Sequence, residues 1–134
     1  MTPRIPRTPI LVVDDNRDNA DIIREYFEAH GYAVAVAYGG DEALAQFEKT
    51  APALVLLDVM MPDRDGWEVC REMRQHPALG ASVRIVMVTA LDQFPDELEP
   101  LRRGADDFVE KPFDLGALRT TVQRNLATPR RRAS

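Results

Sequence analysis

Short apolar runs alternate with amphipathic segments through most of the sequence, and this alternation constrains the fold more than any other feature. The runs are continuously apolar and rich in β-branched residues, as expected for strands buried on both faces of a parallel sheet. The sequence predicts five such strands, at residues 10–13, 32–38, 53–57, 83–88 and 107–109.

The segments between these runs have the spacing of helices that bury one face. In the first of them, apolar residues at 22, 23, 26 and 27 precede Gly31, a predicted helix C-cap. Similar stripes occupy residues 43–47, 67–73 and 115–126. The segment 94–103 contains Pro95 and Pro100, and a proline inside a helix removes a backbone hydrogen bond, so we expect the fourth helix to be irregular. Five strand–helix repeats predict a doubly wound α/β domain with five helices.

The chain has 134 residues, the size of one ordinary domain. We expect a flexible tail at residues 1–7, a single domain at 8–127 and a basic tail at 128–134. The net charge is −5, yet five arginines and no acids lie in the two tails. The body is therefore more acidic than the whole chain, which argues against binding to nucleic acid.

Other features favour a cytoplasmic protein. No apolar stretch approaches the roughly 18 residues that span a bilayer, and the N-terminus lacks the apolar core of a secretory leader. Cys70 is the only cysteine, so an intramolecular disulfide and the usual zinc site are excluded. We expect no association with a membrane.

Polar residues collect where the predicted strands end. Asp14 and Asp15 follow the first strand, Asp58 the third and Thr89 the fourth, while the fifth leads into Lys111. In open α/β sheets, ligands bind beyond the carboxyl ends of the strands, so these side chains are expected on one rim.

Such a rim suits phosphoryl transfer to a carboxylate. Clustered carboxylates favour a hard cation such as Mg²⁺, and a carboxylate beside that ion can form an acyl phosphate. Asp58 suits the nucleophile, Asp14 and Asp15 the metal, Lys111 a charge clamp and Thr89 a hydroxyl contact to phosphate. Taken singly, each residue has an ordinary alternative: Asp14 and Asp15 can cap a helix, Asp58 can start a turn, Thr89 can be a strand former and Lys111 a solvated charge. Their coincidence on one edge favours the functional interpretation.

Four blocks of sequence resemble the receiver domain of bacterial two-component response regulators. They are residues 10–16, 56–66, 88–90 and 104–113, which read ILVVDDN, LLDVMMPDRDG, VTA and GADDFVEKPF. The resemblance covers residues 8–127 and implies a flavodoxin-like fold with strand order 2-1-3-4-5. It also implies a cis peptide bond between Lys111 and Pro112.

The same resemblance implies a role for each rim residue. Asp58 accepts a phosphoryl group from a phosphohistidine, and Lys111 binds a phosphate oxygen. Mg²⁺ (or Mn²⁺) is held by the carboxylates of Asp15 and Asp58, by the Met60 backbone carbonyl, and by Asp14 through a water. Thr89 and Phe108 form the switch pair. No organic cofactor is implied.

Departures from the family pattern refine this interpretation. A tyrosine is frequent where Phe108 stands. Met60 and Leu91 are apolar at positions that influence water access to the phosphate, so we predict slow spontaneous dephosphorylation. Pro95 and Pro100 disfavour a standard dimer through the fourth helix, so we expect a monomer or a weak dimer.

We therefore interpret the chain as a stand-alone, phosphorylation-controlled switch that acts by binding other proteins. It is expected to be no enzyme beyond its own phosphorylation and weak autophosphatase chemistry. Its expected partners are a sensor histidine kinase or a histidine phosphotransfer protein, and an unidentified output protein. A receiver fragment of a hybrid kinase or longer regulator, and a phosphorylation-independent docking module, stay open as alternatives. Two other classes fit less well. An aspartyl phosphohydrolase would usually need a second acid two residues after the nucleophile, where this chain has Met60. A flavin-binding flavodoxin relative would need a phosphate-binding loop after the first strand, where the acidic residues 14–18 would repel the phosphate.

Overall fold

Five parallel strands form one sheet in the computed structural model, which describes residues 9–90 and 104–128. The strands are β1 (Pro9–Val13), β2 (Ala33–Ala37), β3 (Leu54–Asp58), β4 (Arg84–Ala90) and β5 (Asp107–Lys111), in the order β2-β1-β3-β4-β5. The predicted flavodoxin-like fold and strand order are confirmed. The third, fourth and fifth strands end later than predicted, so Asp58, Thr89 and Lys111 lie within strands.

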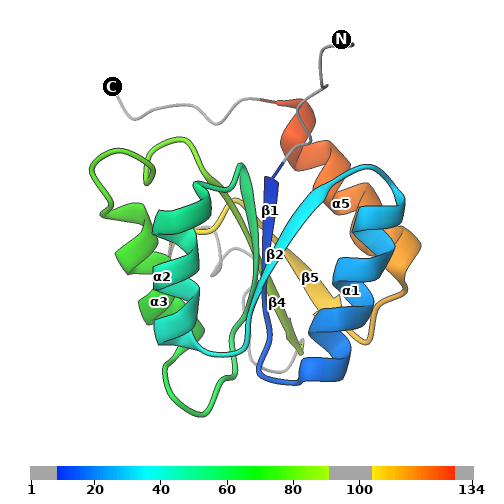
Figure 1. Cartoon of the computed structure of the whole chain (residues 1–134), viewed down its shortest axis with the longest axis horizontal. Helices are drawn as coiled ribbons and strands as arrows, with labels where there is room; N and C mark the ends of the chain where they lie inside the picture. The colour runs from blue at the N-terminus through cyan, green and yellow to red at the C-terminus, as the bar shows by residue number, and fades with distance from the viewer. Residues whose placement is uncertain (1–8, 91–103, 129–134) are drawn as a thin grey trace, which may run out of the picture.

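Helices pack on both faces of this sheet. They are α1 (Arg17–Ala29), α2 (Gly40–Thr50), α3 (Gly66–Arg74) and α5 (Leu115–Ala127). Helices α2 and α3 cover one face, and α1 and α5 cover the other (Figure 1). The predicted irregular fourth helix, with Pro95 and Pro100, lies outside the described residues, as do Leu91, residues 1–7 and most of the C-terminal tail.

Successive strand residues point into two separate cores. In β1, Leu11 packs toward α2 and α3, while Val12 packs toward α1 and α5. In β3, Leu57 and Leu56 divide in the same way, and all four side chains are buried. Burial on both faces explains why the strands are continuously apolar instead of alternating.

An arginine network fastens the edge of the sheet at which the strands begin. The Arg74 guanidinium, at the end of α3, donates from Nε to the Gly104 carbonyl at 2.7 Å and from Nη1 to the Gly80 and Val83 carbonyls at 3.0 and 2.5 Å. Its Nη2 contacts the Asp106 carboxylate. This one side chain joins α3 to the segments that lead into β4 and β5.

The opposite edge gathers the strand ends. Asp58 pairs in register with Val88, and Lys111 pairs with Ala90, so the carboxyl ends of β3, β4 and β5 lie side by side. Among the described residues, no helix has the length and apolarity needed to cross a membrane.

Candidate functional site

Three carboxylates meet at the carboxyl edge of the sheet. Asp14 directly follows β1, and Asp58 is the last residue of the neighbouring β3. One oxygen from each of Asp14, Asp15 and Asp58 lies within 4.8 Å of the others. Asp14 and Asp58 are buried, whereas Asp15 is exposed. The sequence predicted this juxtaposition.

Helix capping does not explain these acids. The N-cap of α1 is Asn16, whose side chain accepts a hydrogen bond from the Asn19 amide at 3.1 Å. Asp14 instead accepts from the Asn16 amide at 2.9 Å, which holds its carboxylate at the edge of the sheet. The capping alternative therefore applies to the neighbour of the acids.

Lys111 supplies the cation of the cluster. Lys111 is the last residue of β5, and its Nζ lies 3.3 Å from Asp58 Oδ2. The Met60 amide donates to the other oxygen, Oδ1, at 3.2 Å. Both oxygens of Asp58 are thereby oriented by groups on different segments.

Burial raises the pKa of the Asp58 carboxyl above its usual range. The Lys111 ammonium opposes this rise in pKa, whereas the negative charge of Asp14 adds to it. Three acids share one lysine here, so the described cluster carries excess negative charge. A small divalent cation would neutralise that negative charge, and Mg²⁺ prefers oxygen ligands such as these carboxylates.

Thr89 lies on β4, which neighbours the acceptor strand β3, and Phe108 lies on the adjacent strand β5. Thr89 is 2% exposed, and its Oγ1 donates to the Ala90 carbonyl at 3.3 Å. Phe108 is half-buried, pairs in register with Met87 and packs against the core beneath α2 and α3. Their predicted switch roles stay predictions.

The loop after Asp58 is tied to another helix through a contact that the sequence analysis missed. Helix α2 begins after Gly39, which has no side chain to cap it. Asp63, from the β3–α3 loop, accepts hydrogen bonds from the Gly40 amide at 2.9 and 3.1 Å and from the Asp41 amide at 3.4 Å. These backbone hydrogen bonds, chiefly from Gly40, lower the pKa of Asp63.

Arg64 reinforces the same contact. It reaches Asp41 on α2 at 3.2 Å and Glu68 on α3 at 2.5 Å, and it also contacts Glu72. A Cβ atom at Gly40 would lie 2.7 Å from the Arg64 Cβ, so the close approach of loop and helix requires glycine there. The only hint in the sequence is the uncapped start of α2 at two consecutive glycines.

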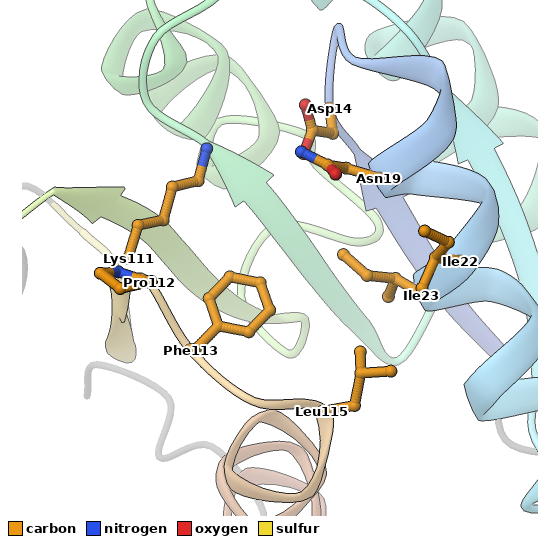
Figure 2. A pocket seen from close by; sticks show the side chains of 8 residues that line it. All are labelled: Asp14, Asn19, Ile22, Ile23, Lys111, Pro112, Phe113 and Leu115. Atoms are coloured by element: carbon orange, nitrogen blue, oxygen red, sulfur yellow. The ribbon is translucent and has the colours of Figure 1, made fainter.

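A groove of about 490 Å³ opens beside the acid cluster. Figure 2 shows the Asp14 carboxylate and the Lys111 amine at one end, with apolar side chains leading away from them. Residues from α1 and from the β5–α5 segment line it: Asp14, Asn19, Ile22, Ile23, Lys111, Pro112, Phe113 and Leu115. Ile22 is 52% exposed there. Ile22 lies in the apolar stripe of its helix, a position that predicts burial, so the groove was not predictable from the sequence.

The peptide bond between Lys111 and Pro112 is cis, as the resemblance implied. The bond lies at the end of β5, next to both the groove and the acid cluster. This prediction is confirmed.

Comparisons with known proteins agree with this geometry. The family model of the response regulator receiver domain matches residues 10–123. The receiver domain of NtrX from Brucella abortus is 35% identical, with a TM-score of 0.78, and the match covers 89% of this chain and 98% of that one. CheY4 of Vibrio cholerae, a chemotaxis response regulator, is 28% identical, with a TM-score of 0.80 and coverage of 90% and 99%. A CheY-like receiver domain protein from Methanospirillum hungatei is 28% identical, with a TM-score of 0.80 and coverage of 91% and 95%.

Proposed function

The chain belongs to the family of response regulator receiver domains, which are phosphorylation-controlled switches of two-component systems, and we propose that Asp58 is its phosphoryl acceptor. The observation that carries this proposal is the position of Asp58. Its carboxylate is buried at the strand edge, 3.3 Å from the Lys111 ammonium and grouped with Asp14 and Asp15.

Each residue of the cluster has a part in the transfer. A carboxylate oxygen of Asp58 attacks phosphorus, and Lys111 binds an oxygen of the incoming phosphoryl group. Receiver domains bind Mg²⁺ at an acidic pocket, and here Asp15, Asp58 and the Met60 carbonyl would hold Mg²⁺ or Mn²⁺, with Asp14 acting through a water. The ion supplies neutralisation of phosphate charge.

The signal is a shift between two states of the domain. Thr89, buried next to the acceptor strand, is drawn toward the phosphate, and the Phe108 ring turns inward into the space beside it. Phosphorylation changes the relative stability of the two arrangements, because the phosphoryl oxygens interact with Thr89 in only one of them. Output then follows from protein–protein binding.

The phosphoryl group comes from a sensor histidine kinase or a histidine phosphotransfer protein, and the switch works in the cytoplasm as a monomer or weak dimer.

The two alternatives left open by the sequence make different demands on the acid cluster. A receiver fragment of a larger regulator has the same site and chemistry. A phosphorylation-independent docking module has no need of Asp58 and Lys111, yet both are present and in contact.

Receiver domains are not enzymes of the classical kind, and we propose weak autophosphatase chemistry here. The Met60 side chain is 64% exposed beside the acceptor and carries no hydrogen-bonding group of use to water. It therefore orients no attacking water, which favours a long-lived acyl phosphate.

Intact-mass measurement after incubation with acetyl phosphate and Mg²⁺ tests the proposal. We expect one added phosphoryl group, which is absent in Asp58→Asn and in the metal-free sample. Asp107→Asn is the matched control, because Asp107 is a half-buried acid at the start of β5 that pairs with Arg124 at 2.6 Å instead of joining the cluster. No adduct, together with no beryllofluoride complex, would instead favour the docking module.

A further inference from the structure

We propose that Met60 is a site of reversible oxidation, and that its sulfoxide shortens the lifetime of phosphorylated Asp58. The oxidant is a peroxide, such as hydrogen peroxide. Oxidation of this one side chain makes the duration of the signal depend on oxidising conditions. The lifetime effect rests on the proposed function, since it needs Asp58 to be the acceptor.

Exposure distinguishes Met60 from the other methionines that the structure describes. Met60 is 64% exposed, whereas Met73 and Met87 are 0% exposed and Met61 is partly buried against the core beneath α2 and α3. A thioether reacts only where the oxidant reaches its sulfur, so oxidation follows exposure. The thiol of Cys70 is buried in the same core and is shielded as well. Met60 is therefore the sulfur that a peroxide reaches first.

The fold tolerates a sulfoxide at this position. Met60 lines a hollow of about 320 Å³ in the β3–α3 loop, together with Met61 and Trp67. The added oxygen is polar, and at an exposed side chain it stays in contact with water. A sulfoxide at Met73 or Met87 would instead bury a polar atom in an apolar core. Oxidation of Met60 therefore changes the surface of the loop and leaves the core intact.

The loop backbone holds Met60 close to the acceptor. The Met60 amide donates to Asp58 Oδ1 at 3.2 Å, and the side chain of Met60 begins two bonds from that nitrogen. A thioether sulfur is a weak hydrogen-bond acceptor and orients no water, whereas a sulfoxide oxygen is a polar acceptor. A water that donates a hydrogen bond to this oxygen keeps a lone pair free to attack the phosphorus on Asp58.

Both chemical steps balance with peroxide and water as the reactants. A sulfur lone pair of Met60 attacks one peroxide oxygen and the O–O bond breaks, so sulfur loses two electrons. The departing oxygen takes the bonding pair and the proton of the transferred oxygen, and leaves as water. In the later hydrolysis, the water oxygen bonds to phosphorus and the phosphorus–oxygen bond to Asp58 breaks. The carboxylate keeps that electron pair, and the proton of the water passes to the released phosphate.

Partial oxidation gives a sample that contains its own control. The protein is treated with hydrogen peroxide until part of it is singly oxidised, and catalase then removes the peroxide. Acetyl phosphate and Mg²⁺ phosphorylate the mixture, and desalting removes the donor. Intact mass follows the loss of the phosphoryl group separately in oxidised and unoxidised molecules, because the added oxygen changes the mass. We expect the oxidised molecules to lose it about tenfold faster.

Variants and repair assign this effect to one sulfur. Peptide mapping should find Met60 oxidised before Met61, Met73 and Met87. Met60→Leu has no sulfur at this position, so its phosphoryl group should be lost at the same rate before and after peroxide. Met61→Leu is the matched control and should respond to peroxide as the wild type does. Methionine sulfoxide reductases specific for the two sulfoxide epimers should together restore the slower rate.

The outcomes separate this inference from the proposed function. If Met60 is oxidised first but the oxidised molecules lose phosphate no faster, or if peroxide accelerates the loss equally in Met60→Leu, the inference is wrong. Oxidation of Met61, Met73 or Met87 ahead of Met60 also overturns it. If the untreated wild type gains no phosphoryl group in the presence of Mg²⁺, the proposed function fails and the lifetime effect fails with it. The mapping does not depend on phosphorylation, so the two failures are distinguishable.

Discussion

Removing the Asp63 carboxylate tests whether the β3–α3 loop and helix α2 are coupled. In Asp63→Ala the amides of Gly40 and Asp41 lose the oxygen atoms that lie 2.9–3.4 Å away. Gly39 has no side chain to replace them. Loss of a helix cap costs about 1 kcal/mol, with a range of about 0.5–2, and for a domain of this size that lowers Tm by about 3–5 °C.

The same change should weaken metal binding. Met60 lies between Asp58 and Asp63, so a loop released from α2 presents its backbone carbonyl less regularly to the ion. Urea unfolding gives the stability. A Mg²⁺ titration followed by the fluorescence of Trp67, which lies in the first turn of α3 after the loop, gives the affinity. Asp114→Ala is the matched control: its carboxylate caps α5 by accepting from the Ala117 amide at 2.7 Å, so it should lose similar stability and bind Mg²⁺ normally.

The dependence on pH has a definite sign. The pKa of Asp63 is lowered in the folded protein, so its charge stabilises the fold above the ordinary aspartate pKa of about 3.9 and ceases to do so as the pH falls through the lowered value. The stability difference between wild type and Asp63→Asn should therefore be present at pH 7 and vanish in acid. If Asp63→Ala equals the wild type in both stability and Mg²⁺ affinity, the coupling through the cap is refuted.

Three further perturbations have expected outcomes. Asp58→Asn should stabilise the metal-free protein at pH 7, because burial raises the pKa of Asp58 and the fold therefore favours a neutral side chain there; a destabilised variant in urea unfolding would contradict this. Arg74→Ala should cost about 3–5 kcal/mol, since it removes one of the two arginine partners of Asp106 and the donor to three carbonyls. Thermal unfolding measures the loss, and a loss under about 1 kcal/mol would argue against the network. Met60→Asn should shorten the lifetime of the phosphorylated protein about tenfold by orienting water, as followed by decay of the mass adduct; an unchanged lifetime would count against the water-access argument.

The strands and the acid cluster were predictable because local patterns determine them. A run such as residues 54–57 is apolar on both faces only if both faces are covered, which implies a parallel sheet between helices. Parallel strands share one carboxyl edge, so the sequence positions of Asp14, Asp58 and Lys111 were enough to bring them together. The cis bond before Pro112 came from the family resemblance alone.

The loop cap and the groove were not predictable in this way. Asp63 and Gly40 are 23 positions apart, and nothing in either local sequence specifies which acid reaches which helix. Ile22 belongs to an apolar stripe that predicts burial, yet it is 52% exposed and lines the groove between α1 and the β5–α5 segment. Both features depend on how the loops pack against the sheet and helices, and the pattern of apolar and polar residues along the sequence does not specify that packing.

The two edges of the sheet differ in how their charges are compensated, and this difference links stability to function. At the starting edge, Asp106 is contacted by Arg74, by Arg84 at 3.5 Å and by the Ile85 amide at 2.8 Å, so its charge is fully used for packing. At the carboxyl edge, three acids share Lys111, and burial works against ionisation of Asp58. The Asp106 contacts stabilise the sheet, and the sheet holds the three acids of the carboxyl edge close together in spite of their repulsion. A change that relieves the repulsion at the carboxyl edge therefore removes the feature that favours a divalent ion and a phosphoryl group, whereas a change at the starting edge alters stability alone.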